Sequence, residues 1–171
     1  MSYFNQFGTI LYDPTGDGSA KLCTDILSRV RVRANMKKEI VMLDTYAVKE
    51  NETPEIVADK HHGSPYYHWV VMLINDIFDV NHDWVKSTRQ LQKYLLSKYT
   101  EIQLTETHHF EILQTSGDTT TKIEVENSTY PSASIVTNYE YEVALNDSKR
   151  EIDLLRNDYL TFFVEEFQSS I

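Results

Sequence analysis

The hydrophobic pattern between residues 39 and 63 predicts a strand followed by a short helix. Residues 39–48 contain two short runs of β-favouring residues, Ile-Val-Met-Leu and Thr-Tyr-Ala-Val. Thr53 and Pro54 then supply a hydroxyl N-cap with proline at the first helical position, a combination that starts helices. Gly63 is well placed to end this helix, because glycine adopts a positive φ without strain.

A second helix is predicted directly after the first. Ser64 and Pro65 repeat the start signal, and the segment YYHWVVMLI that follows is apolar on nearly every side. A helix of that kind must be buried all round. We therefore predict a compact unit of two short helices whose structural core includes Trp69, Leu73 and, farther along, Trp84.

A weaker helical pattern precedes this unit. Residues 21–36 carry apolar side chains at helical spacing without proline, and predict an N-terminal helix. Arg29, Arg33 and Lys37 fall four apart, so on a helix they form one basic stripe. In this acidic chain the stripe is either a solvated face or a docking surface for an acidic partner.

The segment after residue 100 has a β-rich pattern. Residues 101–127 are rich in Thr, Ile and Val, and a Ser-Gly-Asp turn at 116–118 between two β-like runs predicts a hairpin. Residues 139–145 alternate Tyr, Val and Leu with Glu and Ala, which predicts a half-exposed strand. Residues 151–155 are predicted to return the chain.

Two further helices complete the predicted elements. Ser87 caps a helix whose apolar stripe includes Leu91 and Leu95, and Asn157 begins a closing helix with Phe163 and Phe167 on one face. The predicted fold class is α+β, with an N-terminal helix before the central unit and a hairpin and helix after it. We divide the chain into an N-terminal arm and helix (1–44), the central module with its following helix (45–100) and a β-rich segment with the closing helix (101–171).

Composition narrows the range of partners. The chain has 16 Lys and Arg against 26 Asp and Glu, a formal net charge of −10. A protein that tracks phosphates needs a cationic surface, so nucleic acid is not expected as a main partner. Eleven tyrosines, seven phenylalanines and two tryptophans suit either a partly wet interface or a β-rich core, and both interpretations stay open.

The sequence also argues against export and membrane insertion. The opening residues MSYFNQFGTILYD lack the basic start and long apolar run of a signal peptide, and no apolar run approaches the roughly 20 residues of a membrane helix. Cys23, the single cysteine, cannot form an internal disulfide and is predicted to be a small buried apolar residue. We expect a soluble protein that is intracellular when synthesised.

The best candidate for a metal site starts like a calcium loop but departs from it. Residues 79–83 follow the pattern D-x-N-x-D, yet the sixth position holds Trp84 in place of glycine and the twelfth holds Gln90 in place of glutamate. The six histidines form no H-E-x-x-H or Cys/His pattern, and the adjacent His108 and His109 would point to opposite faces of a strand. No metal site is predicted.

Catalytic signatures are also missing. No G-x-S-x-G elbow occurs, and the DPTGDGSAK segment lacks the phosphate-loop spacing. Acidic pairs such as Glu165-Glu166 are expected by chance in so acidic a chain. We predict neither catalytic residues nor a cofactor, and we do not expect an enzyme.

The central unit resembles a LysM module, the strand-helix-helix-strand unit known for binding N-acetylglucosamine polymers. Asn51-Glu52-Thr53 stands where that module usually has Gly-Asp-Thr, and Asn75 falls where it carries its well-known asparagine. A LysM module closes with a short strand, whereas here the residues after Ile77 continue as FDVNHDWVKS. The resemblance therefore lacks its final strand.

A narrower resemblance covers most of the chain. The run ETPEIVADKHHGSPYYHWVVMLINDIFDVNHDWVKS is similar to the T4-type baseplate wedge protein 53 family of contractile-tailed bacteriophages. The shared features are the Thr-Pro-Glu helix start, the Gly-x-Pro corner before Tyr-x-x-Trp, and Asn75 followed by an aspartate-rich loop ending in Trp84. The upstream TDILSRVRVR and the later TNYEYEVALNDSKREIDLL also fit, and residues 105–134 fit least.

The resemblance implies a structural role in the virion. The protein would be a subunit of the inner ring of the tail baseplate, in the host cytoplasm during assembly. Its partners would be the wedge core bundle, the sheath-initiator subunit and neighbouring wedge copies. The runner-up function is a LysM protein that binds peptidoglycan or chitin.

The candidate partner contacts follow from both interpretations. They are the basic stripe and the two loops at either end of the helix pair, namely Arg29, Arg33, Asn51, Glu52, Thr53, Asn75 and Asp76. If the loops bind protein, Thr53 and Asp76 should be exposed in the isolated chain and buried in the assembly. A glycan reader would leave both open.

Overall fold

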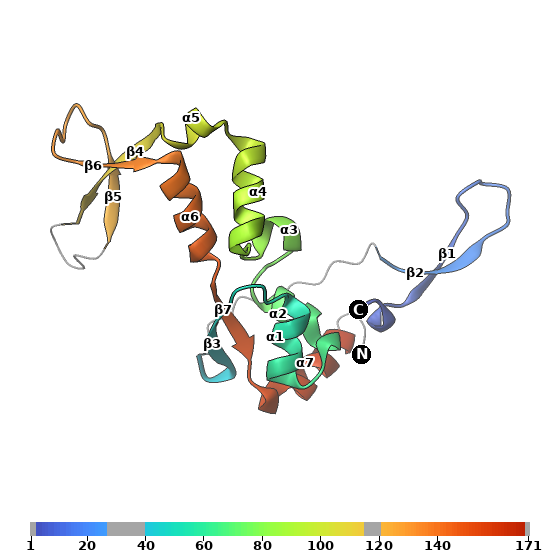
Figure 1. Cartoon of the computed structure of the whole chain (residues 1–171). Coiled ribbons are helices and arrows are strands. Elements are labelled where there is room, and N and C mark those ends of the chain that lie inside the picture. Colours follow the sequence, from blue (N-terminus) through green and yellow to red (C-terminus); the bar gives the residue numbers. More distant parts are fainter. Residues whose placement is uncertain (1–2, 27–39, 115–120, 170–171) are drawn as a thin grey trace. The chain divides into compact units, whose positions relative to one another are not determined.

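The computed structural model describes residues 3–26, 40–114 and 121–169 and has an α+β fold (Figure 1). The chain forms two compact units. Unit 1 comprises residues 1–84 and 151–171, and unit 2 comprises residues 85–150, so unit 2 is an insertion in the sequence of unit 1. None of the helices described is long and apolar enough to cross a membrane. The predicted three-part division of the chain stays a prediction.

The N-terminal part of unit 1 begins with a 3-10 turn at Tyr3–Gln6, followed by a hairpin of β1 (Thr9–Tyr12) and β2 (Lys21–Thr24). The helix predicted from residue 21 is therefore wrong for residues 21–24. The Asp13 carboxylate accepts hydrogen bonds from the amides of Gly16 and Gly18, both at 2.8 Å, and this tight turn lets the two strands pair. Cys23 is exposed on β2, against the prediction that it is buried.

The centre of unit 1 follows the predicted order of strand and two helices. A 3-10 turn at Ile40–Met42 leads into β3 (Leu43–Ala47), then come α1 (Pro54–His62), a 3-10 turn at Pro65–Tyr67, α2 (His68–Ile74) and the short α3 (Val80–Asp83). The predicted caps are confirmed. The Thr53 hydroxyl accepts from the Ile56 amide, Gly63 ends α1 with φ 72°, and the Ser64 hydroxyl accepts from the Tyr66 amide.

Unit 1 is completed by β7 (Glu151–Leu155) and α7 (Asn157–Ser169) from the end of the chain. β7 pairs antiparallel with β3, with Tyr46 opposite Ile152 (Figure 1). The predicted returning strand is confirmed, but it pairs with β3 and not with residues 139–145. The strand that pairs with β3 thus follows unit 2 in the sequence.

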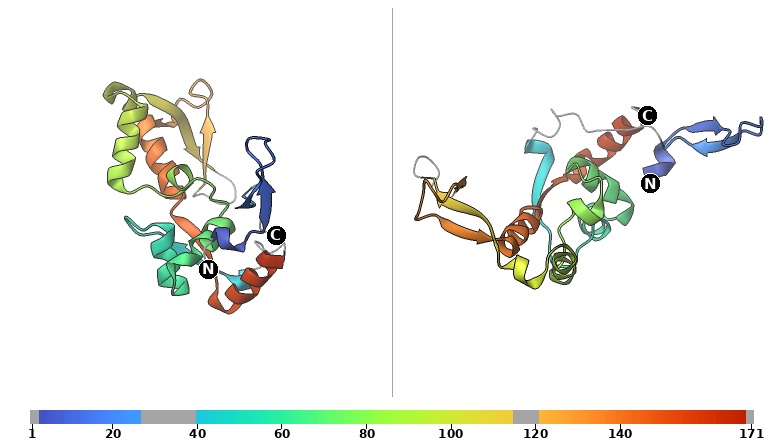
Figure 2. Two further views of the ribbon diagram at one scale, coloured as in Figure 1. Left: turned by 90° about the vertical axis from the view of Figure 1, so that its right-hand side faces the viewer. Right: turned by 90° about the horizontal axis from the view of Figure 1, so that it is seen from above.

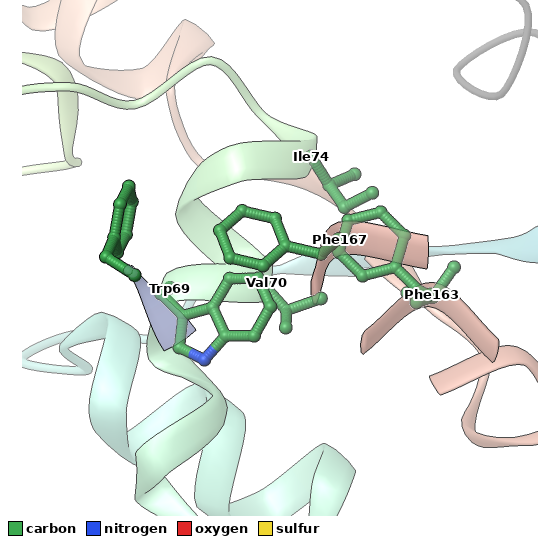
Figure 3. Close-up of a cluster of buried hydrophobic side chains, with 7 residues drawn as sticks. Trp69, Val70, Ile74, Phe163 and Phe167 are labelled. Atoms are coloured by element: carbon green, nitrogen blue, oxygen red, sulfur yellow. The ribbon is translucent and has the colours of Figure 1, made fainter. Parts of the chain in front are cut away.

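Aromatic side chains of α2 and α7 build the core of unit 1 (Figure 3). The ring centroid of Trp69 lies 4.6 Å from that of Phe167 and 6.1 Å from that of Phe163, and Phe7 packs edge-on against Phe167. Leu73 is partly buried against this cluster. The four apolar residues of α2 with the lowest exposure, Trp69, Val70, Val71 and Ile74, lie on several sides of the helix, as expected for an apolar helix.

Unit 2 combines helices with a three-stranded sheet. It contains α4 (Thr88–Lys98), α5 (Glu101–Leu104), β4 (Thr107–Leu113), β5 (Lys122–Val125), β6 (Ser134–Thr137) and α6 (Asn138–Ser148). The sheet order is β5-β4-β6, so the predicted hairpin is confirmed as the β4–β5 pair, while its predicted turn lies outside the described residues. Helices α4 and α6 lie side by side (Figure 2).

The strand predicted for residues 139–145 is wrong, because these residues belong to α6. Thr137 and Glu140 form a complete capping box, in which the Thr137 hydroxyl accepts from the Glu140 amide and the Glu140 carboxylate accepts from the Thr137 amide. Glu142 and Asn146 are buried four residues apart on one helix face. The buried positions of this helix are polar, so the residues lack the apolar stripe that would have indicated a helix.

Candidate functional site

The two predicted contact loops each contain a non-glycine residue in the left-handed region. Asn51 has φ 64° and Asp76 has φ 54°. Such values are uncommon outside glycine and are most often adopted by Asn and Asp. Asn51, Thr53 and Asp76 are exposed, so these three predicted contacts are open at the surface of unit 1. Arg29 and Arg33 lie outside the described residues.

Glu52 differs from its loop neighbours because it is buried, with 7% exposure. Its Oε2 accepts hydrogen bonds from the Tyr46 hydroxyl and the Lys49 amide, each at 2.8 Å, and its Oε1 accepts from Lys60 Nζ at 2.5 Å. One carboxylate therefore ties β3 to the loop and to α1. In this structure Glu52 holds the loop in shape from within, whereas the sequence interpretation placed it among the partner contacts.

The hydrogen bonds keep Glu52 ionised. Burial is the largest influence and raises the pKa of Glu52, but the bonds from Lys60, the Lys49 amide and Tyr46 together hold that pKa below its ordinary value. Burial, followed by the bond to Glu52, raises the pKa of the Tyr46 hydroxyl. A negative charge at position 52 is thus part of the folded module.

Trp84 joins the same loop to the residues that follow α3. Its side chain is 5% exposed, and its Nε1 donates a hydrogen bond of 2.8 Å to the carbonyl oxygen of Glu52. Because an indole N–H can only donate, the buried backbone carbonyl satisfies it completely. Trp84 therefore packs within unit 1, in the region that the sequence assigned to the core.

Asn75 pairs its side-chain amide with the backbone of β7. Its Nδ2 donates to the carbonyl oxygens of Asp153 at 2.7 Å and Val71 at 2.8 Å, and its Oδ1 accepts from the Asp153 amide at 2.9 Å. The amide thus imitates one residue of a neighbouring strand. Asn75 holds the end of α2 against β7, a role that its position in the sequence does not reveal.

An Asn75→Ala variant is expected to lower the free energy of unfolding of unit 1 by about 1–3 kcal/mol, because both polar groups of Asp153 lose their partner. Urea titration followed by tryptophan fluorescence measures this change, since both tryptophans lie in unit 1. The exposed Asn81, changed to alanine, is the matched control. Equal stability of the two variants would contradict the assignment of Asn75 as a clamp on β7.

A histidine and asparagine group joins α1 to the junction of β7 and α7. His61 Nε2 donates to the Leu155 carbonyl oxygen at 3.0 Å, His62 Nδ1 lies 2.9 Å from Asn157 Oδ1, and Asn157 Nδ2 donates to the His61 carbonyl oxygen at 2.7 Å. Sequence reasoning missed this group, because its members are far apart in the chain. The local helix-start signal at Asn157 gave no indication of these contacts.

His62 is held neutral by its surroundings. Burial lowers the pKa of His62 below its ordinary value of 6.5, the adjacent His61 acts in the same direction, and the bond to Asn157 opposes both. The His62 Nε2 atom is buried and has no hydrogen-bond partner among the described residues, while the Tyr67 ring lies 6.0 Å from the imidazole. Protonation would therefore place a positive charge and an unpaired N–H donor at the buried Nε2 atom.

The stability of unit 1 is expected to fall as the pH drops below about 6.5, since the unfolded chain then binds a proton that folded His62 resists. The loss continues until the pH reaches the lowered pKa of the folded state. Urea titrations at several pH values above the range where carboxylates titrate measure this slope. A His62→Asn variant, which keeps an amide for Asn157, should flatten the slope. A slope as steep as that of the wild type would contradict this account.

The aspartate-rich segment after α2 forms a capped helical turn. The Asp79 carboxylate accepts from the Asn81 amide at 2.8 Å and lies 2.7 Å from His82 Nδ1, and the Asp83 carboxylate accepts from the amides of Phe78 and Asp79. The bond to His82 is the largest cause that lowers the pKa of Asp79. These carboxylates serve α3 itself, and no group of three or more His, Cys, Asp or Glu that could hold a metal ion occurs within the residues the structure describes.

His108 and His109 come together, which corrects the prediction that they point to opposite faces. The pairing of β4 with β6 shifts register between Thr107 and His109, and this irregularity removes the simple alternation. The Nδ1 atoms of the two imidazoles lie 2.8 Å apart, and His108 stacks on Tyr141 with ring centroids 3.8 Å apart. The group packs β4 against α6 within unit 2.

Unit 2 has its own buried polar contacts. The buried Glu142 carboxylate accepts hydrogen bonds from Lys98 Nζ at 2.5 Å and from the Tyr99 hydroxyl at 3.1 Å. The bond between Lys98 and Glu142 is the largest cause that raises the pKa of Lys98. Asn146 pairs its amide with both backbone groups of Lys86, at 2.8 and 3.0 Å. Because Lys86 and Asn146 lie near the two ends of the insertion, this pair holds those ends together.

Comparison with known proteins shows which family this chain matches. The family model described as "Base plate wedge protein 53" matches residues 18–131, which is more than half of the chain. The baseplate wedge protein gp53 of Enterobacteria phage T4 is 30% identical over 60 residues, which are 35% of this chain and 31% of that protein. The aligned segment thus spans about a third of this relative. The family resemblance expected from the sequence is confirmed.

Proposed function

The chain belongs to the base plate wedge protein 53 family, and on that premise we propose that it is a structural subunit of a bacteriophage tail baseplate. The family match over residues 18–131 is the observation that carries this proposal. The chemistry of the described residues agrees with it. The polar groups of the buried Glu52 and Glu142 and of the partly buried Asn75 are occupied with backbone and side-chain contacts that hold the fold. The role is non-enzymatic.

The segment β3-α1-α2-β7 is proposed to be a LysM-like module. Strand β3 is followed by two helices joined at a Gly-Ser-Pro corner, and the antiparallel pairing of β3 with β7 supplies the second strand. Asn75 at the end of α2 binds that second strand directly. The departure noted in the sequence, the missing strand after Ile77, is resolved if residues 85–150 are an insertion before the final strand of the module.

The finer role that we propose is in the inner ring of the baseplate. The LysM-like module would contact the core bundle of its own wedge, the sheath-initiator subunit and a neighbouring wedge. Asn51, Thr53 and Asp76 supply exposed polar contacts, Arg29 and Arg33 set the register, and Glu52 and Asn75 hold the loops in shape from within. Exposed aromatic residues such as Tyr66 and Phe78, at 61% and 67% exposure, supply apolar area. The chain would assemble in the host cytoplasm and end in the virion.

Affinity capture from infected host cells tests the proposal against its glycan-binding rival. Tagged chain is expected to recover baseplate subunits, and the recovery should be unchanged when chitin oligomers are added as competitor. Variants Thr53→Asp, which keeps an N-cap for α1, and Asp76→Asn, which tolerates the positive φ, should reduce recovery, whereas a change at the exposed Asn127 of unit 2 should not. Recovery of cell-wall fragments that the oligomers displace would overturn the protein-binding role.

A further inference from the structure

The outer edge of β3 is an open strand edge. Antiparallel strands alternate between residue pairs that exchange hydrogen bonds and pairs whose N–H and C=O groups point away from each other. Thr45 lies opposite Asp153, and both backbone groups of Asp153 bind Asn75, on the side away from β3. The Thr45 backbone groups therefore also point away from β7. Because the pattern repeats every two residues, the backbone N–H and C=O of Ala47 also point away from β7.

The two edges of this small sheet are treated differently. The outer edge of β7 is satisfied by side chains, with Asn75 at Asp153 and His61 at the Leu155 carbonyl. On the edge of β3, no hydrogen bond from within the described part of the chain reaches the backbone groups of Thr45 or Ala47, and both residues are exposed. The β7 edge is thus occupied at Asp153 and at the Leu155 carbonyl, whereas the β3 edge is left available.

β3 also lacks three of the features that protect strand edges from pairing. Proteins can guard an edge with lysine, proline or a bulge, whereas β3 reads Leu-Asp-Thr-Tyr-Ala and pairs in regular register. The sheet is acidic, because Asp44, Glu151 and Asp153 are exposed and neither strand contains lysine or arginine. The edge therefore suits an extended segment that carries basic side chains.

We propose that an extended, basic strand of another baseplate protein pairs with the edge of β3 and adds a third strand to the β3–β7 sheet. Main-chain hydrogen bonds from Thr45 and Ala47 would supply affinity, and the carboxylates of the sheet would select a basic segment. The inference rests on the proposed function and deepens it, since it names the edge that the partner uses.

Hydrogen exchange at single amides, in the isolated full chain and in assembled baseplates, tests the pairing. The amides of Asp44 and Tyr46, which bond to β7, should exchange slowly in both states. The amides of Thr45 and Ala47 should exchange rapidly in the isolated chain and slow by at least about tenfold in the baseplate. A Thr45 amide that is already slow in the isolated chain, or still fast in the baseplate, would overturn the inference.

A proline variant tests whether the pairing matters for assembly. Thr45→Pro removes an outward N–H that β7 does not use, so the module should stay folded by circular dichroism while incorporation into the baseplate falls at least about tenfold. Thr45→Ser keeps the N–H and should incorporate normally. If wild-type chain is not incorporated, the proposed function fails and the inference with it. If wild type and Thr45→Pro are incorporated equally, strand pairing alone is overturned.

Discussion

A Trp69→Ala variant is expected to leave unit 1 unfolded or barely stable. Truncating a buried tryptophan to alanine removes about 3–5 kcal/mol, and whole domains are stable by only about 5–15 kcal/mol. Trp69 is 4% exposed, and its ring packs from α2 against Phe163 and Phe167 of α7. Its loss therefore opens a cavity beside these two phenylalanines. The two helices lie far apart in sequence, and this contact is a main part of what joins them.

Urea titration with fluorescence detection measures this loss, because Trp84 remains as a reporter within unit 1. The matched control is Tyr66→Ala, since Tyr66 precedes the same helix but is 61% exposed, and its unfolding midpoint should lie close to that of the wild type. A Trp69→Ala chain that stays folded by circular dichroism and only loses its partners would show that Trp69 serves an interface.

A Leu154→Ala variant is expected to destabilise unit 1 by about 2–5 kcal/mol. Leu154 is 1% exposed in β7, the strand that reaches unit 1 only after residues 85–150. If β7 is the closing strand of the module, removing this side chain should unfold α1 and α2 as well. The effect would then appear in the fluorescence of Trp69 and Trp84, which precede the insertion in sequence.

Leu145→Ala is the control for this substitution, since Leu145 is 42% exposed on α6 of unit 2. Its effect on the unfolding midpoint of unit 1 should be small. A Leu154→Ala variant with the same midpoint as Leu145→Ala would contradict the role of β7 in the module, and residues 43–84 would then be stable without it.

Local signals made the middle of the chain predictable. Thr53, Ser64 and Ser87 each satisfy backbone donors at the start of a helix or turn, and Gly63 takes the positive φ that ends α1. These contacts involve residues two to four apart, so a single sequence contains all the information they need. The helices at 54–62 and 88–98 were predictable for that reason.

The failures have two causes. Residues 21–24 have apolar positions compatible with a helix, and their pairing with β1, across a turn held by Asp13, makes them a strand. Residues 139–145 alternate as a strand would, yet they form a helix that begins at the Thr137 capping box and whose Glu142 accepts a bond from Lys98. The pairing with β1 and the bond from Lys98 lie outside the short window of the pattern, whereas the capping box is a local signal that the alternation outweighed in our interpretation.

The candidate site was predictable as a region but not in its roles. The loops 51–53 and 75–76 were identified from the sequence, and Asn51, Thr53 and Asp76 are at the surface. The inward direction of Glu52 depends on Lys60 and Tyr46, and the task of Asn75 depends on Asp153, which lies beyond the insertion. Partners this distant cannot be inferred from the spacing of residues along the chain.

We propose that this chain is a baseplate subunit whose LysM-like module binds protein. Electron cryomicroscopy of intact tails from the phage that encodes it tests this most directly. We predict density for the chain in the wedge, with Thr53 and Asp76 covered by another subunit and a third strand beside Thr45. Baseplates that lack the chain, or that contain it with these loops open to solvent, would contradict the claim.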